Sequence, residues 1–169
     1  MKEIKGRAAW VFADDFDVDY IIGIENIRVN DINKIMELLM KPFETDFKEK
    51  VKAGDILIGG KNFGYGHPHP QAMMGMRQLG IDTIVAESFA FAFYRSELAA
   101  GMKLIVCPGI REIVNRWDEI TVDMAKNKVI NLTQAKEQVC EEIAEIPMKI
   151  MEYGGIVGFL QNRAEHKLL

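Results

Sequence analysis

The sequence has little that would tie the protein to a membrane, a nucleic acid or a disulfide framework. Only two cysteines occur in 169 residues, Cys107 and Cys140, and their separation fits no metal motif, so we expect two reduced thiols. No apolar run approaches the roughly 18 residues that a spanning helix needs. Twenty-one lysines and arginines against 25 acidic residues give a net charge of −4, which argues against a nucleic-acid partner and against polybasic membrane attachment. The first residues show no apolar leader segment, so we expect a cytoplasmic protein.

The composition that remains is that of an ordinary globular domain. Hydrophobic residues make up 49% of the chain and charged residues 27%. The length fits one domain with a short appendage. We therefore expect a single domain over residues 1–169, with a C-terminal helical extension over about 133–169.

Short apolar runs alternate with amphipathic segments through the first two thirds of the chain. The pattern predicts strands at 5–12, 56–58, 82–86 and 102–106, and helices at 31–40, 43–51, 71–79 and 88–100. Alternating strands and helices imply parallel pairing with right-handed crossovers, hence an α/β fold. Residues 119–124 and 128–130 follow as a hairpin, and we expect helices at 134–144 and from Pro147 to Tyr153.

The segment 59–71 (GGKNFGYGHPHPQ) carries the clearest sign of function. It leaves a buried strand and enters a helix, whose first N–H groups are free to bind an anion. Such a loop is also found as a simple tight connection, so the glycines alone are weak evidence. His67 and His69 make an incomplete metal site, and we predict no metal ligand in the chain. A role in acid–base chemistry fits imidazoles better, because they titrate near neutral pH.

The segments 17–22 (DVDYII), 60–66 (GKNFGYG) and 86–90 (AESFA) follow one another in this order. They resemble motifs of the small subunit of 3-isopropylmalate dehydratase, the swivelling domain of the aconitase superfamily. The segments 52–56 (KAGDI) and 154–157 (GGIV) resemble its shorter, archaeal-type branch. The resemblance covers nearly the whole chain. It implies a swivelling β/β/α domain that closes over a larger partner subunit carrying a [4Fe-4S] cluster, with no cofactor in this chain. The implied activity is that of a hydro-lyase of leucine biosynthesis, which moves a hydroxyl of a small hydroxy acid by dehydration and rehydration. Self-association of the isolated chain is left open.

The sequence departs from the family at the positions that carry its chemistry. His67 stands where the family has its catalytic serine, and His69 stands where it has an arginine that holds a substrate carboxylate. Two further family arginines are replaced by Glu25 and Phe91, and a family cysteine is Tyr65. Neither histidine nor phenylalanine can form the two parallel hydrogen bonds that an arginine makes with a carboxylate.

Three interpretations of these departures compete. In the first, the chain serves a related hydro-lyase with a substrate other than isopropylmalate. In the second, it serves isopropylmalate or a closely related malate, with carboxylate contacts supplied elsewhere. In the third, it is a non-catalytic binding or regulatory module that keeps the swivelling scaffold. We favour the first, with His67 as the catalytic base. The predicted substrate-binding residues are Asn62, Gly64, Tyr65, Gly66, His69 and Glu25.

Overall fold

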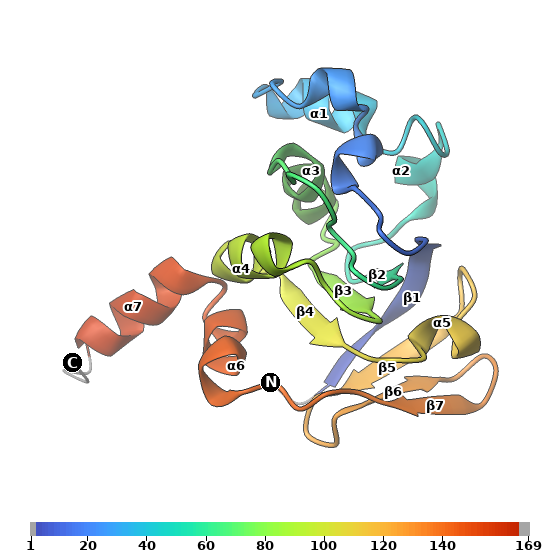
Figure 1. Ribbon diagram of the computed structural model, residues 1–169, viewed down its shortest axis with the longest axis vertical. Helices are drawn as coiled ribbons and strands as arrows, with labels where there is room; N and C mark the ends of the chain where they lie inside the picture. The colour runs from blue at the N-terminus through green and yellow to red at the C-terminus, as the bar shows by residue number, and fades with distance from the viewer. Residues whose placement is uncertain (1–2, 166–169) are drawn as a thin grey trace.

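The computed structural model describes residues 3–165, which form a seven-stranded mixed sheet with helices packed around it (Figure 1). The strand order is β4-β3-β2-β1-β5-β6-β7. The strands are β1 (Glu3–Val11), β2 (Ile56–Gly59), β3 (Thr83–Ala86), β4 (Lys103–Val106), β5 (Glu119–Asp123), β6 (Lys128–Asn131) and β7 (Lys136–Val139). The helices are the 3-10 turns η1 (Val18–Ile21) and η2 (Ile24–Asn26), then α1 (Ile32–Leu38), α2 (Phe47–Lys50), α3 (Gln71–Gln78), α4 (Phe91–Ala99), α5 (Ile110–Ile113), α6 (Glu145–Glu152) and α7 (Ile156–Glu165).

The first four strands form the parallel half of the sheet, as the sequence predicts. β1 pairs with β2, β2 with β3 and β3 with β4, all in parallel. Every residue of β2 and β3 is buried, which is the pattern of strands covered on both faces. Because the four strands run in parallel, their carboxyl ends lie at one edge of the sheet, the usual place for a ligand site in an open α/β sheet.

The last three strands are antiparallel, and here one prediction is wrong. The hairpin of β5 and β6 is present, but residues 134–144 are not a helix: they include β7, which pairs with β6 from Lys128↔Val139 to Asn131↔Lys136. β7 is an edge strand with mostly exposed side chains, so it shows no apolar alternation. Backbone pairing with β6 therefore decides its conformation. The helical extension begins at Glu145, not at residue 133.

The two ends of the strand order are brought together by the segment after β7. The Glu141 N–H donates to the Val106 carbonyl at 2.9 Å, so the sheet curls until the end of β4 meets the chain leaving β7. Cys107 and Cys140 lie at this junction as free, buried thiols. Their mutual hydrogen bond raises the pKa of Cys107 and lowers the pKa of Cys140. Both cysteines therefore lie where the two ends of the sheet meet.

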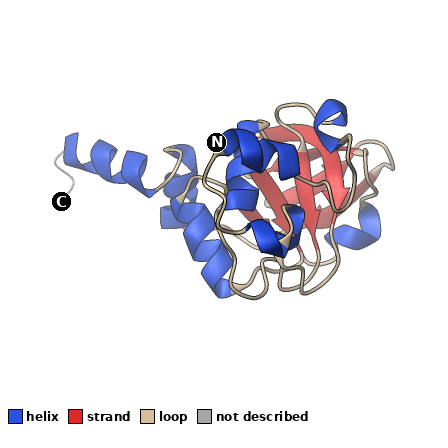
Figure 2. Ribbon diagram, turned by 90° about the horizontal axis from the view of Figure 1, so that it is seen from above, coloured by secondary structure: helices blue, strands red, loops and turns tan. Residues whose placement is uncertain are grey.

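The helices confirm most predicted elements with shifted ends. α1 begins after Asp31, whose side chain accepts from the Asn33 N–H as an N-cap. The predicted helix at 43–51 is confined to α2, and the one at 88–100 begins only at Phe91. α6 and α7 pack against each other, and both views show α7 extending away from the sheet (Figures 1 and 2). α7 is helical to Glu165, and the chain then passes outside the described residues. Across residues 3–165, no helix combines the length and apolar character needed to cross a membrane.

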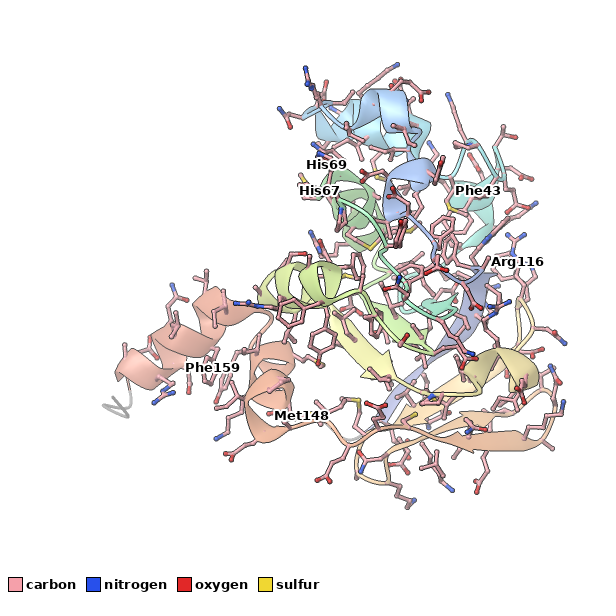
Figure 3. The ribbon with its side chains drawn as sticks, in the orientation of Figure 1. Phe43, His67, His69, Arg116, Met148 and Phe159 are labelled. Atoms are coloured by element: carbon pink, nitrogen blue, oxygen red, sulfur yellow. The ribbon has the colours of Figure 1, made fainter. Side chains whose placement is uncertain are left out.

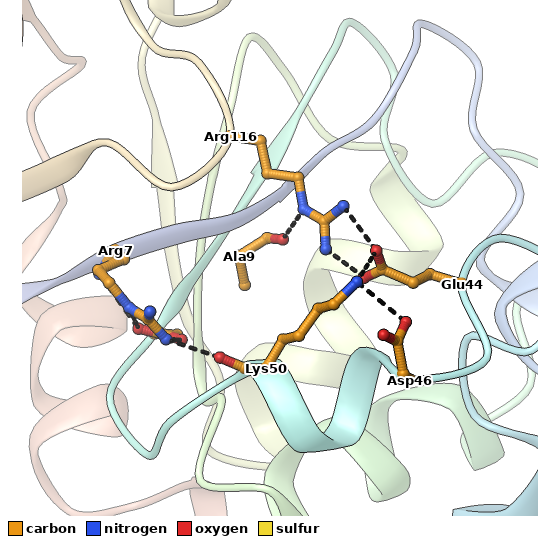
Figure 4. A network of polar contacts seen from close by, with 7 residues as sticks. Arg7, Ala9, Glu44, Asp46, Lys50 and Arg116 are labelled. Atoms are coloured by element: carbon orange, nitrogen blue, oxygen red, sulfur yellow. Dashed lines mark hydrogen bonds and ion pairs between the residues drawn. The ribbon is translucent and has the colours of Figure 1, made fainter.

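A network of charges ties α2 to the sheet (Figure 4). Arg116 binds the Glu44 carboxylate through both guanidinium Nη atoms and donates from Nε to the Ala9 carbonyl at 2.9 Å. Lys50 approaches the same carboxylate at 2.7 Å. Hydrogen bonds from Arg116 and then from Lys50 lower the pKa of Glu44 from 4.5 to about 2.

We expect Glu44→Gln to lower the free energy of unfolding at pH 7 by about 1–3 kcal/mol, because hydrogen bonds to a charged group are lost. The pKa of Glu44 is depressed in the folded state, so its contribution is complete above pH 4.5 and disappears as the pH falls toward 2. In urea unfolding between pH 7 and pH 2, the difference in stability between wild type and variant should therefore shrink as the pH falls. Glu49→Gln on α2 removes an exposed carboxylate that makes no ion pair within residues 3–165, and it should change stability little at any pH. A pH-independent difference for Glu44→Gln would contradict this account.

Candidate functional site

The histidine-containing loop leaves the carboxyl end of β2 and enters α3, as the sequence predicts. Its first half is fastened to the segment that follows β1. The backbone N–H groups of Gly64 and Tyr65 both donate to the Phe16 carbonyl, at 2.9 and 3.2 Å. The Asn62 N–H donates to the Ser88 hydroxyl at 2.8 Å, and its side-chain amide donates to Asp15 at 2.8 Å. Residues 60–65 are therefore held by the loops that follow β1 and β3.

Phe63 anchors the same half of the loop in the core. Its ring is fully buried and stacks on Phe16 with ring centroids 5.8 Å apart. Phe93 of α4 meets it edge-on at 5.4 Å. Gly64 follows in the left-handed region, with a φ of +83°, directly against the Phe93 ring. The aromatic packing thus fixes where the loop leaves the core and where its second half begins.

His67 lies on the exposed second half of the loop (Figure 3). It borders a depression of about 200 Å³ between the loop and α4, lined by Gly66, His67, Pro68, Ala92 and Ser96. Its imidazole makes no hydrogen bond or ion pair with the rest of residues 3–165. Both ring nitrogens are therefore available to a ligand or a partner.

His69 is held quite differently. The Asp19 carboxylate accepts the His69 backbone N–H at 2.9 Å through Oδ1 and contacts ring Nδ1 at 2.7 Å through Oδ2. The Asp19 side chain is only 8% exposed, whereas the His69 side chain is 39% exposed. A buried carboxylate thus orients a histidine whose outer edge faces solvent.

The acidic residues of the run 14–19 have different roles in the structure. Asp17 is the N-cap of η1, accepting the Asp19 N–H at 2.9 Å. Asp14 instead accepts the Lys61 N–H at 2.8 Å and pairs with Arg111 at 2.6 Å, and these contacts lower its pKa. Asp19 holds His69, a role that the sequence reasoning missed. The separation of 50 residues between Asp19 and His69 leaves no local signal for such a pair.

The predicted substrate-binding residues do not all gather on one surface. Tyr65, Gly66 and His67 are exposed together, and His69 lies two residues further along. Asn62 and Gly64 hold the loop in place, as described above. Glu25 is exposed in η2, where its carboxylate accepts from Asn26 at 3.3 Å, and it makes no hydrogen bond to the loop.

Groups that could bind a metal are also dispersed. In the part of the chain that the structure describes, no three His, Cys, Asp or Glu side chains come close enough to hold a metal ion. The two thiols are 0% and 7% exposed and share a hydrogen bond where the two ends of the sheet meet. They do not form the open thiolate set that an iron–sulfur cluster needs.

Comparison with known proteins supplies the context for this loop. Residues 22–108 match the family described as the aconitase C-terminal domain. Over 160 residues the chain is 37% identical to the isopropylmalate/citramalate isomerase small subunit of Methanocaldococcus jannaschii, covering 95% of each chain. It is 35% identical over 158 residues to 3-isopropylmalate dehydratase small subunit 1 of Methanopyrus kandleri, covering 94% of this chain and 92% of that one. The chain belongs to the 3-isopropylmalate dehydratase small-subunit family.

The small-subunit fold agrees in three dimensions. The crystal structure of 3-isopropylmalate dehydratase from Methanocaldococcus jannaschii matches with a TM-score of 0.85 and 30% sequence identity, over 98% of this chain and 97% of that one. The predicted family, the α/β fold class and the assignment to a hydro-lyase subunit are confirmed.

Proposed function

We propose that this small subunit closes over the active site of a larger subunit, where the pair dehydrates and rehydrates a small hydroxy acid in the cytoplasm. The observation that carries this proposal is the whole-length similarity to small subunits, with the loop at the carboxyl ends of the parallel strands intact in position. The exposed residues of the loop lie together on one surface, which a partner subunit could cover.

We place the cofactor in the large subunit. A [4Fe-4S] cluster bound there would supply a Lewis acid for the leaving hydroxyl. The two cysteines of this chain are buried and hydrogen-bonded to each other, so they are poorly placed to bind such a cluster. The small subunit would contribute polar groups of the histidine-containing loop to the shared active site.

We propose His67 as the group that takes the proton from the substrate carbon. It occupies the position of the family's serine, it is exposed, and its ring nitrogens have no internal partner. An imidazole is suited to this step because its ordinary pKa lies near neutrality. Tyr65 and Gly66 are the neighbouring exposed positions that would face the same substrate.

We further propose that the substrate is not isopropylmalate. Three family arginine positions are His69, Glu25 and Phe91, and each lost charged hydrogen bond costs about 1.5–3 kcal/mol. Phe91 is 75% exposed at the start of α4. The guanidinium of Arg95 lies over its ring, 5.3 Å from the ring centroid. A substrate with less negative charge than a malate dianion fits this set better.

The test is an anaerobic purification of the tagged chain from its source organism. We expect a larger chain to co-purify with brown iron–sulfur absorbance, and the complex to turn over members of a panel of hydroxy acids of differing charge. Recovery of the small chain alone, or with colourless partners and no turnover, would contradict the proposal and favour a non-catalytic module. Turnover of isopropylmalate above all other acids would contradict only the substrate assignment.

A further inference from the structure

The contact between Asp19 and His69 places a proton on Nδ1 of the imidazole ring. An ionised carboxylate has acceptor oxygens and no proton to donate, so the 2.7 Å contact with Oδ2 requires a proton on Nδ1 of His69. The other oxygen, Oδ1, is occupied by the His69 backbone N–H. The two bonds together hold both the backbone and the ring of His69 in one orientation.

When the imidazole is neutral, the remaining nitrogen, Nε2, carries its free lone pair. Asp19 is nearly buried while the His69 side chain is 39% exposed, so the accessible edge of the ring is the one away from the carboxylate. That edge contains Nε2. A neutral ring fixed in this way accepts a hydrogen bond at Nε2 and has no donor left for a ligand.

The charge around this pair disfavours a second anion at His69. Within residues 3–165, no lysine or arginine pairs with Asp19, so its negative charge is uncompensated except by the imidazole. A second carboxylate arriving at His69 would meet this charge. A hydroxyl group would meet an acceptor of the right kind.

We propose that Asp19 is a positioning residue that fixes His69 in the Nδ1–H tautomer, and that Nε2 of His69 accepts a hydrogen bond from a substrate hydroxyl. The substrate class is then a hydroxy acid with a hydroxyl group, not a carboxylate, at this subsite. The substrate part of this inference rests on the proposed function; the tautomer part concerns the isolated chain alone.

The tautomer is measured by long-range proton–nitrogen NMR correlation on the wild-type chain at pH 8, with His67→Gln and His69→Gln used for assignment. We expect the Nδ1 signal of His69 to be that of a protonated nitrogen and the Nε2 signal that of an unprotonated one. In Asp19→Asn, the side-chain amide can donate to Nδ1, so the tautomer should switch to Nε2–H. Asp17→Asn is the matched control, because Asp17 caps the same turn without touching His69. An Nε2–H tautomer or a doubly protonated ring in the wild type overturns the proposal, whether or not Asp19→Asn folds.

The subsite preference is measured with malate and 2,4-dihydroxybutyrate, which differ only by a carboxylate in place of a hydroxymethyl group. Each is titrated at the same concentrations into the isolated chain while the Nε2 signal of His69 is followed. We expect 2,4-dihydroxybutyrate to shift this signal at about tenfold lower concentration than malate. In His69→Arg, followed by the guanidinium signals, the order should reverse. Malate binding to the wild type as well as or better than 2,4-dihydroxybutyrate, or no shift by either, overturns the substrate class. Neither measurement needs the large subunit, so failure to find that partner leaves them unaffected.

Discussion

Replacing His67 with alanine should lower kcat/KM of the assembled enzyme by about 10²–10⁴-fold, the usual contribution of a positioned acid–base group. The fold should not suffer, because the exposed His67 ring makes no hydrogen bond or ion pair inside the described chain. The measurement is steady-state turnover of the complex rebuilt with variant chain, together with the melting temperature of that chain. We expect turnover to fall and both the melting temperature and the recovery of the large subunit to stay as in wild type.

The two histidines of the loop can be separated by their variants. His67→Ala removes a ring without internal partners, whereas His69→Gln removes a ring bonded to a buried carboxylate. If His67→Ala keeps full turnover while His69→Gln loses it, the assignment of His67 as the proton acceptor is wrong and His69 is the histidine that turnover needs. If both variants keep full turnover, neither imidazole acts in catalysis and the loop serves only to bind.

The sequence predicted the parallel half of the sheet well because burial on both faces leaves a strong local signal. β2 and β3 are short, continuous apolar runs, each bounded by glycine or a charged residue. β7 has no such signal, since the segment KEQV is mostly exposed and its backbone is fixed by pairing with β6. Polar edge strands and polar helices are hard to distinguish by composition alone.

The candidate site also combines features visible in one short segment with contacts between residues far apart in the sequence. The loop from Gly60 to Pro70 could be found in the sequence because glycine, proline and histidine are concentrated in it. The partner of each histidine could not, because Asp19 reaches His69 across 50 residues through the turn after β1. Glu25, a position matched by motif alone, accepts from Asn26 in η2 and makes no hydrogen bond to the loop, so its part in substrate binding stays a prediction.

Replacing Gly64 with alanine should destabilise the chain by about 3–5 kcal/mol. Two costs add. The residue has a φ of +83°, which L-amino acids other than glycine adopt only with strain. A Cβ would also lie 2.2 Å from Cγ of Phe93, and that ring is fully buried against Phe63 at 5.4 Å and Phe89 at 6.2 Å. For a chain of this size we expect a fall in melting temperature of about 10 °C or more.

Gly154→Ala is the control that separates the two costs. Gly154 also has a positive φ, +70°, but a Cβ there would meet nothing within 4 Å. It should therefore cost only the left-handed strain, about 1–2 kcal/mol. The difference between the two variants in urea unfolding then measures the contact of the loop with Phe93. Equal losses would mean that the Phe93 ring moves aside, and that the loop carrying His67 and His69 is not fixed by the aromatic core.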